Sequence, residues 1–432
     1  MCRPRTLWKR LVLALLLPVL AGPGFEQAAW AAGFELFAQG GKAAGLAGAF
    51  VARADDPSAV FYNLGGLALA PTEKRYTLGV TALDLREGLY QGLPPGPGAG
   101  TASSQGERMS FLPHLYLVLP VGDDLKVAFA LVSPFVLDTR WQDADAFAGR
   151  SVATSANLMT YDLMAGVSYP LTPRLGVGLA LVYRISELSL DRRFQADDPG
   201  GGPGLDVASV AVTSDTSQGL GWSVGALHRI NDRLSWGISY RSAIGVDFGA
   251  VGTLTQILTG NTQLDQLVAA SLPFDQDLAS GTSISFPDTL SLGVAVGVGR
   301  SLLVEVDAQS TGWSGIDALE LRYSLAPLLD QSIALDLDDA MSYRLGVQYT
   351  TPTGADYRLG LALEETPQPA ATVGPLLADA DRILFTAGFG KDPLDIAFVW
   401  ADTEERVVRN QVDGLNGGYR SSAWTLLLTL TF

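Results

Sequence analysis

The sequence has little cysteine, little charge and little histidine. Its one cysteine, Cys2, lies at the very start, so the rest of the chain has no material for a disulfide framework or a thiolate metal site. Only 17% of the residues are charged, and acidic residues outnumber basic ones to give a net charge of −16. A chain this acidic would be repelled by phosphate backbones, which argues against a nucleic-acid partner.

Catalytic and metal-binding side chains are also scarce. His114 and His228 are the only histidines, so a serine–histidine pair or a histidine metal cluster has almost no material. Packing or hydrogen bonding is the expected role of both. We therefore predict that the protein is not an enzyme and that it holds no metal and no cofactor.

Long apolar runs are confined to the N-terminus, which has the pattern of a secretory signal. Four basic residues in the first ten precede the apolar run 11–20, and residues 29–31 read Ala-Trp-Ala, a small-x-small cleavage site. The apolar core is too short to span a membrane, and no later run reaches the roughly 18 residues that a spanning helix needs. We predict a signal peptide over residues 1–31.

What the chain has in abundance is alternation of apolar and polar residues, the period of a β-strand. In residues 158–169 apolar side chains fall at every second position, with Thr160 and Asp162 on the opposite face. Residues 175–185 alternate in the same way, and so do the final ten residues, 423–432. A chain that ends on such a strand is explained if that strand closes a larger sheet.

Fourteen such segments follow one another, and their connections alternate in length. The predicted strands lie near residues 75–85, 109–120, 125–133, 157–169, 175–190, 217–230, 234–248, 283–298, 302–313, 341–351, 357–364, 382–389, 394–403 and 420–432. Tight turns alternate with long loops near residues 86–108, 134–156, 191–216, 249–282, 314–340, 365–381 and 404–419. Short turns at one end and long loops at the other are typical of an outer-membrane barrel and have no reason in a soluble sandwich.

The sequence therefore predicts an all-β protein, a 14-stranded antiparallel transmembrane β-barrel over residues 75–432. Its last strand should pair with its first, because unpaired backbone groups are too costly in hydrocarbon. Residues 32–74 fit no strand, yet they are rich in Ala, Gly, Phe and Leu and poor in charge, unlike a disordered segment. We predict that they form an N-terminal hatch (plug) inside the lumen, which fourteen strands would otherwise leave open.

Three groups of residues carry a family resemblance. They are Gly33-Phe34 with residues 45–50 and 55–63; Pro134-Phe135 with Trp141 and residues 158–160; and residues 378–382, 386–390 and 394–395. Together they resemble the FadL-type outer-membrane transporters of long-chain fatty acids and their aromatic-hydrocarbon relatives. The resemblance covers essentially the whole mature chain.

The resemblance implies that a hydrophobic ligand lands in a groove between long loops, moves to an inner pocket, and leaves sideways where the third strand kinks. The residues assigned to these steps are Phe34, Phe37, Phe61, Tyr62, Arg184 and Arg344 for substrate contact; Gly33, Asn63, Leu64 and Gly65 for the hatch; and Ser133, Pro134 and Phe135 for the lateral opening. Proline cannot donate to the strand ladder, so pairing should weaken there. No Walker-type phosphate loop is present, so transport should be passive.

The anchor for a ligand carboxylate stays open at this point. Arg184 lies on the small-residue face of its strand and is the first candidate, with Arg344 and Arg241 as alternatives. It is equally open that these arginines pair with barrel carboxylates such as Asp162. Residues 338–340 are Asp-Asp-Ala where the family has a second cationic anchor, so aromatic hydrocarbons remain an alternative ligand.

Two further expectations concern the hatch and the loops. Residues 63–65 read Asn-Leu-Gly where the family usually has Asn-Pro-Ala, so a fixed φ angle is lost and a more mobile hatch is expected. The leucines of loop 249–282 recur at helical spacing and predict short amphipathic helices that offer an apolar landing site.

The expected location is the outer membrane of a Gram-negative cell, with both termini in the periplasm. The expected partners are a hydrophobic small molecule, outer-membrane lipid and lipopolysaccharide, and the barrel-assembly machinery, for a monomeric protein without nucleic acid. The rival interpretation is a general small-solute porin, for which the hatch would have no purpose.

Overall fold

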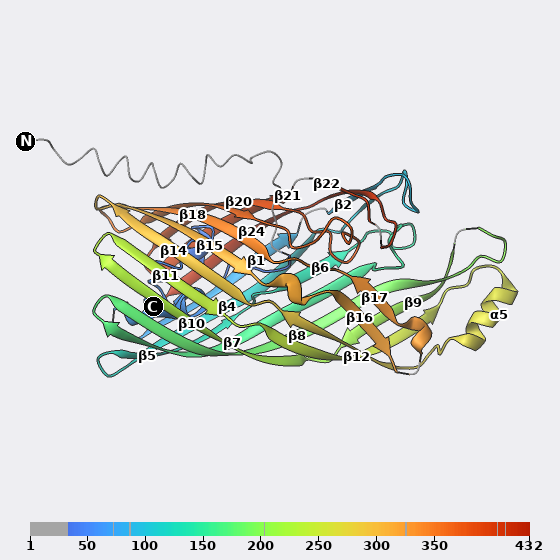
Figure 1. Cartoon of the computed structure of the whole chain (residues 1–432), viewed down its shortest axis with the longest axis horizontal. Helices are drawn as coiled ribbons and strands as arrows, with labels where there is room; N and C mark the ends of the chain where they lie inside the picture. The colour runs from blue at the N-terminus through green and yellow to red at the C-terminus, as the bar shows by residue number, and fades with distance from the viewer. Residues whose placement is uncertain are drawn as a thin grey trace, which may run out of the picture.

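The computed structural model describes residues 33–432 apart from residues 72, 86–87, 203, 325, 404 and 411. The predicted signal peptide, residues 1–31, lies outside the described residues. The remainder forms a closed antiparallel barrel of fourteen strands, as predicted (Figure 1). The wall strands are β1 (Arg75–Leu85), β4 (Arg108–Val121), β5 (Leu125–Val132) with β6 (Val136–Arg140), β7 (Ser155–Thr172), β8 (Leu175–Ala196), β9 (Leu205–Ser214) with β10 (Ser217–Asn231), β11 (Leu234–Arg241) with β12 (Ile244–Gln256), β13 (Leu278–Phe286) with β14 (Thr289–Val298), β15 (Leu302–Thr311) with β16 (Ala318–Tyr323), β17 (Gln331–Ala334) with β18 (Ala340–Thr350), β19 (Asp356–Glu364), β20 (Arg382–Lys391), β21 (Leu394–Thr403) and β24 (Ser422–Thr431).

The last strand closes the barrel on the first. β1 pairs antiparallel with β24 from Thr77↔Thr431 to Leu85↔Ala423. At the seam the backbone groups of Tyr76 and Phe432 exchange two hydrogen bonds of 3.0 and 2.9 Å. The rings of these two residues stack with their centroids 5.4 Å apart. The prediction that the terminal strand leaves no edge is confirmed.

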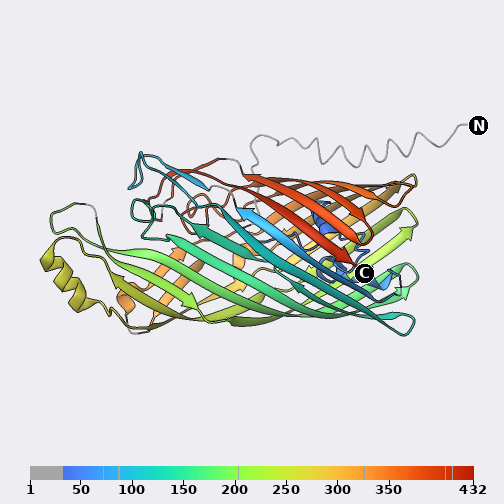
Figure 2. The ribbon, with the colours of Figure 1, turned by 180° about the vertical axis from the view of Figure 1, so that it is seen from behind.

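The barrel has a turn end and a loop end. The tight turns gather at one end, where the C-terminus also lies, and the long connections gather at the other (Figures 1 and 2). At the loop end β2 (Leu89–Gly92), β3 (Ala102–Ser104), β22 (Arg406–Val408) and β23 (Gly417–Arg420) form a small separate sheet. The same end carries α5 (Thr262–Ser271) and the 3-10 turns η1 (Trp313–Gly315) and η2 (Pro327–Leu329).

Four of the predicted loops contain wall strands, so those boundaries were wrong. Residues 134–156 include β6 and the start of β7. Residues 191–216, 249–282 and 314–340 include the end of β8, all of β9, parts of β12 and β13, and β16 with β17. The reason is an inversion of the side-chain pattern. On β12, Val246, Phe248 and Leu254 point inward and are buried, whereas Asp247 points outward and is exposed. Near the loop end the inward face of the wall is apolar and the outward face polar, whereas nearer the turns the outward face is the apolar one.

The predicted helical loop is therefore half correct. α5 is a helix, begun by Asn261, whose side chain accepts hydrogen bonds from Gln263 N and Leu264 N. Leu254, placed in the same helical pattern, lies on strand β12 instead. In the part of the chain that the structure describes, no helix is long and apolar enough to cross a membrane.

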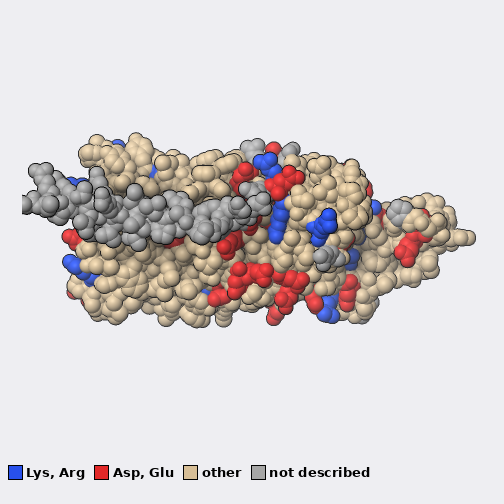
Figure 3. Space-filling model, turned by 45° about the horizontal axis from the view of Figure 1, so that its top comes forward, with Lys and Arg blue, Asp and Glu red and all other residues tan. Residues whose placement is uncertain are grey.

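The hatch folds inside the barrel, in the half near the turns (Figure 2). It contains the short helices α2 (Gly41–Ala44), α3 (Ala59–Tyr62) and α4 (Leu64–Ala68), and nearly all of its residues from 34 to 68 are buried. Its apolar side chains join the main core cluster with inward residues of β5, β7 and β8. On the face seen in Figure 3, charged side chains gather from the middle of the molecule toward the loop end and at the rim of the turn end, and the visible part of the wall between is largely uncharged.

Candidate functional site

The wall is interrupted in its third strand, between β5 and β6. β4 pairs with β5 only as far as Leu115↔Leu131, and β6 pairs with β7 from Val136↔Met159 onward. Among the described residues no ladder pair joins β4 to β6. The two strands are instead bridged by the ion pair of Arg108 and Asp138. The break at Ser133, Pro134 and Phe135 thus leaves a part of the wall without ladder pairs between β4 and β6, which we call the wall window.

The first residues of the hatch pair with the broken strand. Leu36 N donates to Pro134 O at 2.8 Å, and Val136 N donates to Phe34 O at 3.0 Å, so Glu35 lies directly opposite Phe135. The hatch therefore supplies the backbone partners that the kinked strand lacks in the barrel.

Four aromatic rings gather beside the wall window. Phe34 of the hatch packs against Trp313 with ring centroids 4.8 Å apart, and against Phe135 at 5.9 Å. Phe135 also packs on Phe286 at 5.1 Å. All four side chains are buried. Phe34 and Phe135, assigned from the sequence to different steps, are thus in one cluster.

Two adjoining cavities meet at this cluster. One, of about 340 Å³, lies toward the loop end and is lined mostly by apolar residues that include Leu158, Leu188 and Ile284, together with Asp317 and Glu320. The other, of about 200 Å³, runs along the hatch to the seam strands. Phe34, Leu137 and Leu377 line both. None of the described residues that line the larger cavity is a lysine or an arginine. We call these the outer cavity and the hatch cavity.

The arginines assigned to ligand contact are already paired with carboxylates of the wall. Arg184 forms two hydrogen bonds of 2.7 Å to Asp162, and both side chains are buried. Arg344 binds Glu364 at 2.8 Å and the hatch carbonyl of Ala47 at 3.0 Å. The pairing that the sequence left open is the one the structure contains.

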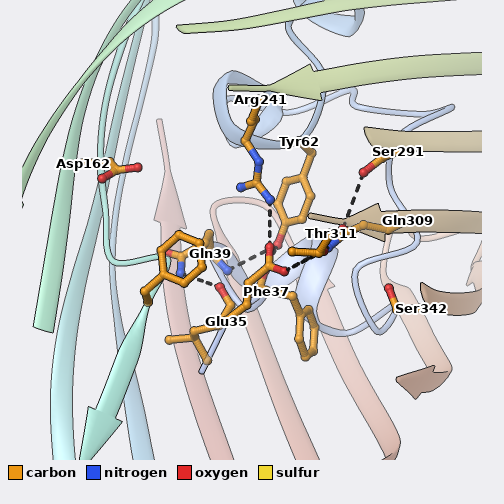
Figure 4. Close-up of polar contacts among 12 residues, drawn as sticks. Glu35, Phe37, Gln39, Tyr62, Asp162, Arg241, Ser291, Gln309, Thr311 and Ser342 are labelled. Carbon is orange, nitrogen blue, oxygen red and sulfur yellow. Dashed lines mark hydrogen bonds and ion pairs between the residues drawn. The ribbon is translucent and has the colours of Figure 1, made fainter. Parts of the chain in front are cut away.

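Arg241 is different, because its carboxylate partner belongs to the hatch. Its Nη2 donates to Glu35 Oε1 at 2.8 Å, and its guanidinium lies 4.1 Å from the centre of the Phe61 ring (Figure 4). Glu35 Oε2 accepts from Gln309 Nε2 at 3.0 Å and from Thr311 Oγ1 at 3.3 Å. The Glu35 side chain is only 3% exposed.

The remaining hatch residues hold the helices together. Asn63 caps α4 by accepting from Gly65 N at 3.0 Å and donates to Val51 O at 2.7 Å and to Ala226 O of the wall at 3.0 Å. The Tyr62 hydroxyl donates to Phe37 O at 2.5 Å and accepts from Gln39 N. Burial raises the pKa of Tyr62, so this hydroxyl keeps its proton.

Phe37 and Gly33 have separate environments. Phe37 lies under the guanidinium of Arg344, 4.8 Å from its ring centre. Gly33 donates its N–H to Asp379 of the loop before β20 at 3.3 Å. The structure therefore brings Phe37, Phe61 and Tyr62 together around one small cavity, while Phe34 lies in the aromatic cluster at the wall window and Gly33 lies against the loop before β20.

Comparison with known proteins decides the family. The model of the family described as "Outer membrane protein transport protein (OMPP1/FadL/TodX)" matches residues 25–432. The chain belongs to this family. The fold just described is therefore that of a family of outer-membrane transport proteins.

The relatives are distant in sequence but similar in structure. The chain is 23% identical to the long-chain fatty acid transport protein of Escherichia coli K12, with 90% of each chain covered. A crystal structure of a Pseudomonas aeruginosa FadL homologue superposes with a TM-score of 0.77 at 20% identity, covering 93% of this chain and 99% of the other. The Ralstonia pickettii toluene transporter TbuX gives 0.63 at 14% identity, covering 91% and 98%.

Sequence reasoning missed several residues that hold the hatch in this FadL-type barrel. Asp307 Oδ2 accepts from Phe50 N at 2.8 Å and from Val51 N at 3.0 Å, and Glu305 Oε1 accepts from Ala52 N at 2.6 Å. Both carboxylates lie on the inward face of β15. Two acidic residues at alternate positions of an apolar strand were a visible signal, because such groups are buried only with partners.

Proposed function

We propose that this protein carries hydrophobic molecules passively across the outer membrane and releases them sideways through the wall window. One observation carries the proposal. Two cavities, lined by apolar side chains together with a few charged ones, meet at Phe34 of the hatch, beside the break in the third strand where the described wall has no ladder partner on the β4 side. A ligand there has lipid within reach without crossing water.

The direction of transport follows from the arrangement of the two ends. We place the loop end outside the cell and the turn end, with the C-terminus, in the periplasm. A ligand would enter the outer cavity, pass Phe34 into the hatch cavity, and leave between β4 and β6. Phe37, Phe61 and Tyr62 would contact it from the hatch.

Lateral release fits the physical chemistry of such ligands. Each methylene that leaves water gains about 0.8 kcal/mol, so a water-filled pore would be a barrier to a long acyl chain. The buried hatch lies in the turn half of the lumen, which opposes the rival interpretation of a general porin. The hatch residues Gly33, Asn63, Leu64 and Gly65 would move with each passage.

Two substrate classes are supported to different degrees. Relatives carry the name long-chain fatty acid transport protein, and the chain length of a fatty acid suits two joined cavities. Neutral aromatic hydrocarbons remain the second candidate, because no lysine or arginine is among the described residues of the outer cavity. Arg184 and Arg344 would then lie near the ligand without binding a carboxylate of it. We further propose a monomer that contacts lipid and lipopolysaccharide and depends on the barrel-assembly machinery.

A disulfide between hatch and wall tests the lateral route. Glu35 and Phe135 form a pair without mutual backbone hydrogen bonds, the strand geometry in which Cα atoms lie about 4.5 Å apart and cysteines can join. In cells that have this protein as their sole transporter of the family, oxidised E35C/F135C should reduce oleate uptake to background, and a reductant should restore it.

The matched control joins two wall strands instead. Thr77 and Thr431 occupy the same kind of pair at the seam, with their hydroxyls 2.9 Å apart. Oxidised T77C/T431C should transport oleate at the unmodified rate. Uptake that continues through oxidised E35C/F135C would disprove movement of this hatch segment during transport.

A further inference from the structure

The charged side chains around the hatch differ in where their partners lie. Arg184 pairs with Asp162 and Arg344 with Glu364, and in both pairs the two residues lie on neighbouring wall strands. Arg241 lies on the wall, but its carboxylate partner, Glu35, lies on the hatch. Movement of the hatch therefore breaks this ion pair, whereas the other two pairs survive it.

The surroundings of Glu35 form a complete binding site for a carboxylate. Three donors from two wall strands converge on its two oxygens: Arg241 Nη2 at 2.8 Å, Gln309 Nε2 at 3.0 Å and Thr311 Oγ1 at 3.3 Å (Figure 4). All three belong to the barrel, which stays in place when the hatch moves. If Glu35 left, these donors would face a cavity lined by Phe37, Phe61 and Tyr62.

Glu35 also lies where an arriving ligand would meet it. It lines both the hatch cavity and the small cavity around Arg241. A molecule whose apolar chain occupied the hatch cavity would therefore bring its head group to Glu35 before it reached Arg241.

We propose that Glu35 occupies the head-group site of an anionic ligand and that exchange of Glu35 for the carboxylate of the ligand releases the hatch. This inference rests on the proposed function and narrows it to hydrophobes with an acidic head. Two carboxylates on one buried guanidinium repel each other, so Arg241 binds Glu35 and a ligand carboxylate less favourably together than either one alone. The carboxylate of the ligand takes the place of the Glu35 carboxylate on Arg241, and Glu35 moves toward the outer cavity.

The exchange is coupled to the wall window by the backbone. Glu35 lies opposite Phe135, and its neighbours form the two hydrogen bonds to Pro134 and Val136. Displacing the Glu35 side chain pulls on this short ladder, which is what fills the break in the third strand. A neutral hydrophobe fills the cavities without competing for Arg241, so it leaves the ladder intact. Glu35 is thus a specificity-determining residue for opening.

A cysteine reporter on the hatch tests the exchange. Cys2 lies in the predicted signal peptide, so L36C would be the one thiol of the mature chain. In lipid nanodiscs, the rate of maleimide labelling of L36C is measured with brominated oleate or brominated oleyl alcohol. Their occupancy is followed as quenching of Trp141, which lines the hatch cavity, using W141F to identify that signal.

We expect bound oleate to raise the labelling rate at least about tenfold above that with bound alcohol. Oleate replaces the charged hydrogen bond between Glu35 and Arg241, and the alcohol does not. In E35Q/L36C labelling should be fast without ligand and should no longer distinguish the two probes. In E305A/L36C, which removes the acceptor of Ala52 N instead, the preference for oleate should persist.

Three results would overturn the inference. Equal labelling of L36C with bound oleate and bound alcohol would show that the head group does not control the hatch. Preference for oleate that survives in E35Q, or is lost in E305A, would show that Glu35 has no special part. If neither probe quenches Trp141, the proposed function fails first, and the exchange fails with it.

Discussion

The side chain of Gln39 is hydrogen-bonded to both backbone groups of Ser133. Its Nε2 donates to Ser133 O at 2.7 Å, and its Oε1 accepts from Ser133 N at 3.1 Å. β5 ends at the residue before, so one amide of the hatch replaces a missing strand at the start of the wall window. The hatch thus does two things at once: it fills the lumen and completes the wall.

Substitution of Gln39 by alanine should loosen the wall window without any ligand. Ser133 is fully buried. Without Gln39, its backbone N–H and C=O would each be left unpaired at a cost of about 1–3 kcal/mol. We expect the amide of Ser133 to exchange its hydrogen at least about tenfold faster in Q39A. Q263A, on the exposed side of α5, is the matched control and should leave that rate unchanged. An unaltered rate in Q39A would show that the kinked strand holds itself.

Breaking the Arg184–Asp162 pair should destabilise the whole barrel. Both side chains are buried, with Phe135 and Phe286 each 4.7 Å from the guanidinium. Removing one partner leaves an uncompensated buried charge, which costs about 3–5 kcal/mol. D162N should therefore lower the denaturant midpoint of the folded, heat-modifiable form seen on gels.

The paired variant separates charge from packing. D162L/R184M removes both charges and keeps similar volumes, so it should be much closer to the unmodified protein than D162N is. If D162N were as stable as the unmodified protein, Arg184 would have another source of compensation and could serve as a ligand anchor after all.

The sequence predicted the barrel because its signal is local and repeated. The number of strands, the tight turns and the closing strand each follow from alternation and turn residues within a few positions. The wall extensions beyond the membrane were missed because the same alternation continues there with its inside and outside exchanged, as Asp247 and Phe248 illustrate. Alternation specifies two faces but does not say which is inward.

The site was predictable only in part, because it is built from distant contacts. Phe34 and Phe135 were identified from their motifs, but nothing local indicates that Glu35 lies against Arg241, 206 positions away. The pairing of Arg184 with Asp162 was left open for the same reason. The contacts between hatch and wall join residues far apart in the chain, and no local sequence pattern specifies which residues meet.

Replacing Gly65 should prevent the hatch from seating. A Cβ at this position would lie 2.6 Å from Leu227 N and 2.7 Å from Ala226 Cα, both of them backbone atoms of β10. G65A should therefore displace α4 and weaken the capping contacts of Asn63. We expect faster proteolysis of the hatch and a higher ion conductance of the reconstituted barrel.

The control for Gly65 is a wall glycine with open space around it. Gly245 has no heavy atom within 4 Å of where its Cβ would be, so G245A should conduct like the unmodified protein. Equal conductance of G65A and G245A would mean that α4 can shift without opening a path.

The loop before β20, residues 365–381, should be more stable in mild acid than in mild alkali. It contributes Leu376 and Leu377 to the cavities, and its Asp381 accepts from Thr366 N at 2.7 Å. Burial raises the pKa of Asp381 to about 6, outweighing the hydrogen bond and the nearby Arg406 that lower it. An aspartate in the unfolded chain titrates near 3.9, so the folded loop retains a proton that the unfolded loop loses.

The direction in which the stability of this loop changes with pH follows from that difference in pKa. The stabilisation is complete below about pH 4 and is lost as the pH rises through about 6. Hydrogen exchange at Thr366, corrected for its intrinsic rate, should therefore be slower at pH 5 than at pH 8. D381N should remove most of this dependence and retain the slower rate, with a small remainder from Asp379, whose pKa burial also raises. A loop that exchanges faster at pH 5 would reverse the assignment, because it would require an ionised carboxylate to be the stabilising form.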